Sequence, residues 1–88
     1  MTELMIETVE DAVRVVRGIQ DRLEAQGELA GALFLCKATG AFYTTSSEAL
    51  IGLLQALDQV SGTPGMEPWA ARQIELVKSE VRKLLDLR

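Results

Sequence analysis

Residues 9–26 read VEDAVRVVRGIQDRLEAQ, and the spacing of their apolar side chains decides the fold class. The apolar positions recur at alternating steps of three and four residues: Val9, Ala12, Val16, Ile19 and Leu23. An α-helix makes one turn about every 3.6 residues, so this spacing places these side chains along one face of a helix. The stretch therefore predicts an amphipathic helix that packs against other helices.

Two further stretches repeat this pattern, one near the C-terminus and one in the middle of the chain. Their apolar positions are Ala70, Ile74, Val77, Val81 and Leu84, and Leu50, Leu54 and Leu57. The middle stretch is apolar over more than half of its circumference, which is typical of a central helix. We expect an all-α fold, a small three- or four-helix bundle with helices at about 9–26, 28–38, 46–60 and 68–87. At 88 residues the chain has the length of a single domain, residues 1–88.

Residues with a preference for helix ends bracket these segments. Thr8 is followed three residues later by Asp11, and Thr45 by Glu48; both spacings suit a side-chain cap at a helix N-terminus. Gly27 follows the first periodic segment, where a left-handed C-terminal cap is expected. The residues before Thr8 are expected to form a frayed leader.

The segment from residue 28 to residue 45 admits a second interpretation. Residues 32–37 and 41–45 could form two strands around a turn at 38–40, which would give an α+β fold with a β-hairpin at about 32–45. Positions 28–38, however, contain no valine, isoleucine or threonine. Their Leu, Ala, Phe and Cys residues favour a buried helix, with Gly40 as its stop.

Charge and hydropathy exclude several classes of partner. The chain has 9 basic and 13 acidic residues, a net charge of −4, which disfavours nucleic acid and anionic membranes. The segment 47–60, the recognition helix of a helix-turn-helix interpretation, contains no lysine or arginine. The longest apolar run, at residues 29–36, is far shorter than the ~20 residues that span a bilayer. We expect a cytoplasmic protein with neither nucleic-acid nor membrane partners.

The small size of the chain points to association. A core this thin provides little net stability, and small domains compensate with disulfides, metals, regular helix packing or oligomerisation. Cys36 is the single cysteine and histidine is absent, which excludes an intrachain disulfide and leaves no structural zinc site. Regular packing and self-association remain.

No residue pattern indicates catalysis, a cofactor or a metal. Without histidine, acid–base chemistry near neutral pH would need a perturbed carboxylate, lysine or cysteine. The acidic residues are scattered over polar faces, and Cys36 follows an apolar run with no base to activate it. The sequence therefore predicts that the protein is not an enzyme.

Hydroxyl side chains precede the third expected helix. Amide groups at a helix N-terminus bind phosphate, so a loop at 43–47 that binds a small ligand or phosphate is the alternative functional interpretation. Its candidate residues are Tyr43, Thr45, Ser46 and Ser47. The segment lacks the glycine-rich loop and the lysine of a specific phosphate site, and capping explains its hydroxyls more simply.

The favoured functional interpretation is a non-enzymatic protein–protein interaction domain or accessory subunit. It would form a homo-oligomer or bind a protein partner through apolar helix faces, chiefly that of the last helix. Large apolar residues near a loop often anchor interfaces, which adds Met66 and Trp69 to the seam. The candidate interface residues are Met66, Trp69, Ile74, Val77, Val81 and Leu84.

Glycines inside the expected helices need a structural reason. Gly18, Gly31 and Gly52 each destabilise a helix by about 0.5–1 kcal/mol relative to alanine. Close approach of neighbouring helices is the expected reason.

Overall fold

The computed structural model describes residues 6–41, 43, 45–62 and 66–86, and these residues form four helices. The helices are α1 (Val9–Ala25), α2 (Leu29–Gly40), α3 (Ser46–Ser61) and α4 (Pro68–Asp86). No strand occurs among the described residues, so the all-α prediction is confirmed and the β-hairpin at about 32–45 is wrong. Helix α2 extends through most of that segment, since its unbranched and small side chains lose little freedom in a helix. The expected starts at residues 9, 46 and 68 are the observed ones, and the other described boundaries agree to within two residues; the expected end at residue 87 lies outside the described residues.

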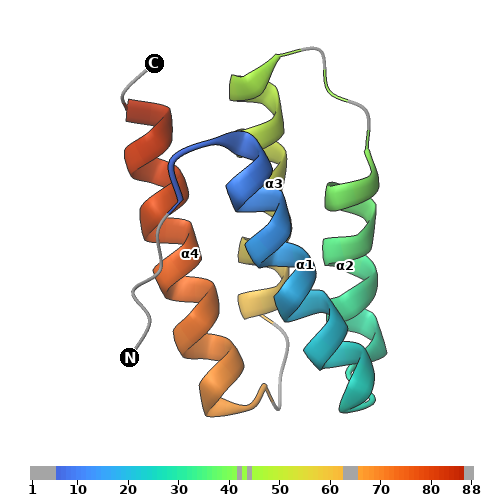
Figure 1. Cartoon of the computed structure of the whole chain (residues 1–88). Coiled ribbons are helices and arrows are strands. Elements are labelled where there is room, and N and C mark those ends of the chain that lie inside the picture. The colour runs from blue at the N-terminus through green and yellow to red at the C-terminus, as the bar shows by residue number, and fades with distance from the viewer. Residues whose placement is uncertain (1–5, 42, 44, 63–65, 87–88) are drawn as a thin grey trace.

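Consecutive helices run antiparallel and form a flattened bundle of 35 × 31 × 19 Å (Figure 1). Helices α1 and α3 contact each other and also both outer helices, α2 and α4. The two outer helices lie on opposite sides of this central pair and do not touch each other. Each outer helix therefore turns only part of its circumference toward the core. The expectation that the segment 46–60 is central holds for α3, and α1 shares that position.

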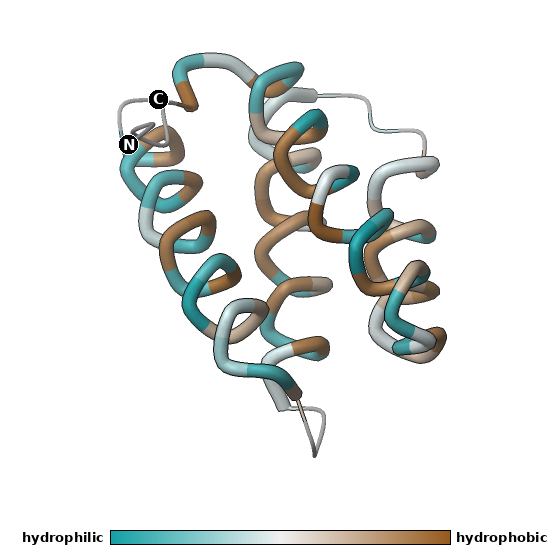
Figure 2. Tube along the Cα trace, turned by 60° about the horizontal axis from the view of Figure 1, so that its bottom comes forward, coloured by the Kyte–Doolittle hydropathy of each residue, from teal (hydrophilic) through white to brown (hydrophobic). Residues whose placement is uncertain are grey.

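The core is aliphatic and draws on all four helices. Its largest fully buried side chains are Leu35, Leu50, Leu53, Leu57, Ile74, Val16, Val60, Val77 and Val81. Figure 2 shows apolar colour along most of α3, whereas α4 alternates between polar and apolar from turn to turn. The helical spacing of the sequence therefore brings the predicted stripes together in one core.

The predicted helix ends have the expected geometry. The hydroxyl oxygen of Thr8 accepts a hydrogen bond from the backbone N–H of Asp11 at 3.1 Å. The hydroxyl of Thr45 accepts from the N–H of Glu48 at the same distance. Gly27 has a φ of 82°, the left-handed conformation that follows a helix C-terminus.

The segment before α1 differs from the expected frayed leader. Ile6 is only 6% exposed and belongs to the core, and the N–H of Glu7 donates to the Asp11 carboxylate at 3.2 Å. An apolar residue before a helix cap can pack back onto the bundle and hide its surface from water. Residues 6 and 7 are therefore anchored, while residues 1–5 of the expected leader lie outside the described part of the chain.

Close packing explains Gly52 but neither Gly31 nor Gly18. A Cβ at Gly31 would lie 3.4 Å from a methyl group of Val60, which is an ordinary van der Waals contact. A Cβ at Gly52 would lie 2.5 Å from the hydroxyl of Tyr43, whose ring occupies that space. Gly18 has no atom within 4 Å of the corresponding position, so the described structure gives no packing reason for it.

Candidate interaction surface

The apolar stripe of α4 lies inside the bundle. Ile74, Val77 and Val81 are 0% exposed and Leu84 is 8% exposed, and all four pack in the common core. The sequence pattern predicted an apolar helix face correctly, but the remaining helices of the same chain cover it. While the bundle is closed, this stripe presents no surface to another molecule.

Trp69 and Met66 lie at the edge of that core. Both side chains are half-buried and pack against core residues. The indole Nε1–H of Trp69 donates to the Gln26 side-chain oxygen at 3.1 Å, and the Arg22 guanidinium stacks 3.9 Å from the ring centroid. These contacts are of the hydrogen-bond and cation–π types that fix an indole in place. Trp69 thus joins the start of α4 to the end of α1.

The hydroxyl loop at 43–47 borders a shallow depression between the start of α1 and the start of α3. Tyr43, Thr45 and Ser46 line it together with Glu10, whereas Ser47 is half-buried and is not part of this lining. The Tyr43 hydroxyl donates to the carbonyl oxygen of Ala38 at 3.0 Å, and the Thr45 hydroxyl serves as the cap of α3. The Glu10 carboxylate disfavours an anion in this depression, since like charges repel.

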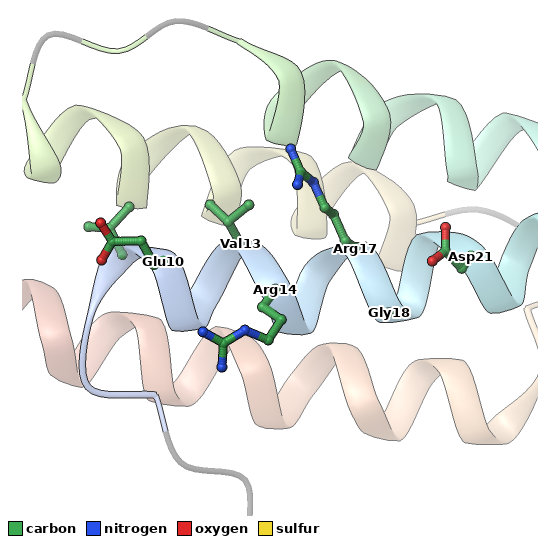
Figure 3. A pocket seen from close by; sticks show the side chains of 7 residues that line it. Glu10, Val13, Arg14, Arg17, Gly18 and Asp21 are labelled. Atoms are coloured by element: carbon green, nitrogen blue, oxygen red, sulfur yellow. The ribbon is translucent and has the colours of Figure 1, made fainter.

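A furrow runs along α1 (Figure 3). All of its lining residues come from this one helix, and they include Arg14, Arg17, Asp21 and the unfilled position at Gly18. Figure 3 shows Arg14 and Arg17 projecting to opposite sides of the helix. Arg14 is 3.5 Å from the Asp11 carboxylate, so it is already paired. The furrow has mixed charge and no converging side chains that would define a ligand.

The ion pairs around Lys78 stabilise the packing of α4 on α3. Lys78 of α4 is 8% exposed and pairs with Asp58 of α3 and, at 3.3 Å, with Glu75. The hydrogen bond from Lys78 holds the pKa of Asp58 below its ordinary value, and the same bond raises the pKa of Lys78. A backbone hydrogen bond from Glu7 lowers the pKa of Asp11. Each shift favours the charged form, the opposite of what a carboxyl that donates a proton near pH 7 requires.

No metal site is visible in the part of the chain that the structure describes. None of its clusters brings three or more His, Cys, Asp or Glu side chains close enough to hold an ion. Cys36 is exposed on α2.

The outward side of α2 is rich in exposed apolar side chains. Its exposed residues are Leu29, Ala30, Leu33, Phe34, Cys36, Lys37 and Gly40. Leu29, Leu33 and Phe34 are 67%, 55% and 37% exposed, and Lys37 is the only charged residue in the helix. We call these seven residues the outer α2 face. Its apolar side chains are continuous along the helix because Leu29, Leu33 and Cys36 follow the four- and three-residue steps of one helix side.

A groove runs beside this face, between α2 and α3. We call it the α2–α3 groove; its lining includes Phe34, Lys37, Ala38, Gly52, Gln55 and Ala56. Three of these lining residues, Ala38, Gly52 and Ala56, are small, and the Tyr43 ring, which lies over Gly52, also lines the groove. The groove lining carries one charge, at Lys37, so a convex apolar ridge and a nearly uncharged concavity lie side by side.

Sequence reasoning did not select the outer α2 face, although a signal for it was present. The run at residues 29–36 contains no charged residue. None of the helices described is long and apolar enough to cross a membrane. A helix that is apolar all round needs neighbours on all sides, and α2 has neighbours only on one.

Comparison of the chain with protein-family models, curated proteins and solved structures gives no match.

Proposed function

We propose that this protein is a non-enzymatic interaction module that associates with a second copy of itself through the outer α2 face. The observation that carries the proposal is the exposure of Leu29 and Leu33 at 67% and 55% beside Phe34, on a helix with one charged residue. The largest exposed apolar patch on a typical monomeric protein measures about 300–600 Å² and is often a functional site.

Charge favours a second copy as the occupant of this face. The chain has a net charge of −4, but the outer α2 face contributes none of its acidic residues. Two copies that meet here bring together apolar surface and a single lysine from each side. A long lysine side chain can keep its ammonium group at the edge of an interface, in water. The electrostatic cost of this contact is therefore low compared with contact through the charged faces of α1 or α4.

The area indicates how strong the association should be. If a side chain of this size exposes on the order of 200 Å² when free, Leu29, Leu33 and Phe34 together expose roughly 300 Å². Stable interfaces bury about 800 Å² per partner, and weak ones somewhat less than about 600 Å². We therefore expect a concentration-dependent dimer with a dissociation constant in the micromolar range or weaker.

The test uses two leucines of similar exposure on opposite sides of the bundle. Leu33 on α2 is 55% exposed and Leu76 on α4 is 48% exposed. Sedimentation velocity of the wild type and of the Leu33→Glu and Leu76→Glu variants would be measured from about 1 μM to about 1 mM. We expect Leu33→Glu to weaken the dimer by about tenfold or more, since its carboxylate must lose water in the contact. Leu76→Glu should leave the dimer unchanged.

Two results would contradict the proposal. A wild-type protein that remains monomeric over the whole concentration range has no self-association to explain. A dimer that Leu76→Glu disrupts and Leu33→Glu does not would place the contact on α4. Circular dichroism of each variant shows that a lost dimer is not a lost fold.

A further inference from the structure

The outer α2 face is too small to form a specific dimer by itself. Its large side chains expose roughly 300 Å² per copy, about half of what even a weak specific interface buries per partner. A second copy seated on this face must also cover a neighbouring surface, on either the α1 side or the α3 side.

The two neighbouring surfaces differ in charge. On the α1 side the exposed residues include Arg17 and Glu24, and Figure 3 shows the Arg17 side chain reaching toward α2. On the α3 side the α2–α3 groove has glutamine, glycine and alanine as its α3 lining. Covering charged side chains without pairing them is more costly than covering amides and small apolar residues. The α3 side is therefore the favoured extension of the contact.

Shape supports the same side. Leu33 is 55% exposed on α2, and the lining of the α2–α3 groove includes the small residues Ala38, Gly52 and Ala56. The Tyr43 ring keeps its place over Gly52 through the hydrogen bond of its hydroxyl to Ala38, which holds this wall of the groove in place. An exposed leucine and a groove lined in part by small residues, both on one surface, are the two halves of a self-complementary contact.

On the basis of the proposed self-association, we infer that the dimer is reciprocal: Leu33 of each copy inserts into the α2–α3 groove of the other. A two-fold axis makes such a contact twice, because any residue pair across the interface occurs in both directions. The ridge and the groove are then both covered, and Gln55 lies at the edge of each inserted leucine. Lys37 remains at the rim of the groove, with its stem against the partner and its ammonium group toward water.

The groove is tested by a matched pair of substitutions at exposed Gln55. Gln55→Lys adds a second ammonium group to the groove next to Lys37, whereas Gln55→Met has similar length and no charge; lysine, methionine and glutamine have similar helix propensities. We expect Gln55→Lys to weaken the dimer by about tenfold and Gln55→Met to leave it equal or tighter. Ser79→Lys, at an exposed position on α4, is the control for added charge and should have no effect.

Mixing two weakened variants tests reciprocity. Leu33→Ala removes the ridge but keeps the groove, and Gln55→Lys disturbs the groove but keeps the ridge. Each variant alone loses both contacts of its homodimer, while the mixed dimer retains one intact contact. Titration of fluorescently labelled Leu33→Ala with Gln55→Lys should therefore show a heterodimer that is tighter than either homodimer, because separate contacts contribute approximately additively.

The outcomes separate this inference from the proposed function. A monomeric wild type overturns both. A wild-type dimer that Leu33→Glu disrupts but Gln55→Lys does not leaves the proposed function standing and overturns the groove contact. Two weakened variants whose mixture is no tighter than the homodimers overturn reciprocity. If Gln55→Lys loses helicity in circular dichroism, Gln59→Lys on the same side of α3 takes its place in both measurements.

Discussion

Helices α1 and α2 lie side by side in the bundle, yet they divide polar and apolar residues in opposite ways. The exposed residues of α1 are mostly charged: Glu10, Arg14, Arg17, Gly18, Asp21, Arg22, Glu24 and Ala25. Those of α2 are apolar apart from Lys37 and Gly40. Both helices contribute equally well buried side chains to the core, such as Val16 from α1 and Leu35 from α2, each 0% exposed.

This difference shows that a helix in a bundle has two separate requirements to meet. Burial of an inner face stabilises the fold, and α1 and α2 both meet this requirement. A charged outer face keeps a helix in contact with water, and only α1 has one. An outer face that serves neither the core nor solvation is expected to serve contact with another molecule.

The largest difference in stability is expected between substitutions on the inner side and on the outer side of α2. Leu35→Ala should lower the free energy of unfolding by about 2–5 kcal/mol, because it leaves a cavity in the core. Leu33→Ala, on the outer side of the same helix, should change it by no more than about 0.5 kcal/mol in dilute monomeric protein. Urea denaturation of both variants at low concentration measures the difference. Equal losses would show that the outer side of α2 also supports the fold of the monomer.

The next effect concerns how the two helices begin. The Thr8 hydroxyl caps α1, whereas Glu28 precedes α2 and makes no side-chain cap hydrogen bond. Thr8→Ala should therefore destabilise the protein by about 1 kcal/mol. Glu28→Ala should have a smaller effect, limited to its charge near the helix N-terminus. Thermal unfolding of the two variants checks the ranking, and a larger loss from Glu28→Ala would reverse it.

Replacing a glycine by alanine in each of the two helices should have a smaller effect, and it should raise the stability of the protein instead of lowering it. Gly18→Ala on α1 should stabilise the protein by about 0.5–1 kcal/mol, because a Cβ there meets nothing and alanine is the better helix former. Gly31→Ala on α2 should stabilise the protein less, because the new Cβ would lie 3.4 Å from Val60 and 3.5 Å from Leu23. Denaturant midpoints would show the order. A destabilising Gly18→Ala would mean that something packs on that face of α1 in solution.

The smallest effect contrasts α2, which joins its neighbours by apolar packing, with α4, which is also tied to α3 by the Lys78–Asp58 pair. The pKa of Asp58 is lowered in the fold, so its contribution is complete above its unfolded pKa of about 3.9 and is lost as pH falls through the folded value. The pKa of Lys78 is raised, so its contribution is complete below its unfolded pKa of about 10.4 and is lost as pH rises through the folded value.

The melting temperatures of the wild type and of Asp58→Asn should therefore differ modestly between about pH 5 and pH 10. The difference should shrink toward both extremes. A difference of the same size at pH 2 would show that the substitution acts through packing and not through charge.

Local patterns predicted most of the fold. The stripe from Val9 to Leu23, the caps at Thr8 and Thr45 and the left-handed Gly27 depend on neighbours within a few residues, and all were predictable. The burial of Ile6 was not, because it depends on a surface formed by residues far along the chain.

The candidate surface was harder to predict for a related reason. Periodicity identifies an apolar face but does not say whether the same chain or another one covers it. The pattern of the α4 stripe at Ile74 and Val77 predicts an interface, but the bundle covers this stripe. The composition of residues 29–36 predicts a buried helix, but the bundle leaves Leu29 and Leu33 exposed.

The sequence by itself determined that the chain forms helices, where they begin and end, and which sides of α1 and α4 are apolar, because these properties follow from local propensity and the 3.6-residue repeat. Only the tertiary structure decided which apolar sides are buried inside the bundle and which stay exposed. Helices α1 and α3 lie at the centre, and α2 lies at an edge with neighbours on one side, so Leu29 and Leu33 of α2 stay more exposed than the apolar stripes of α1 and α4.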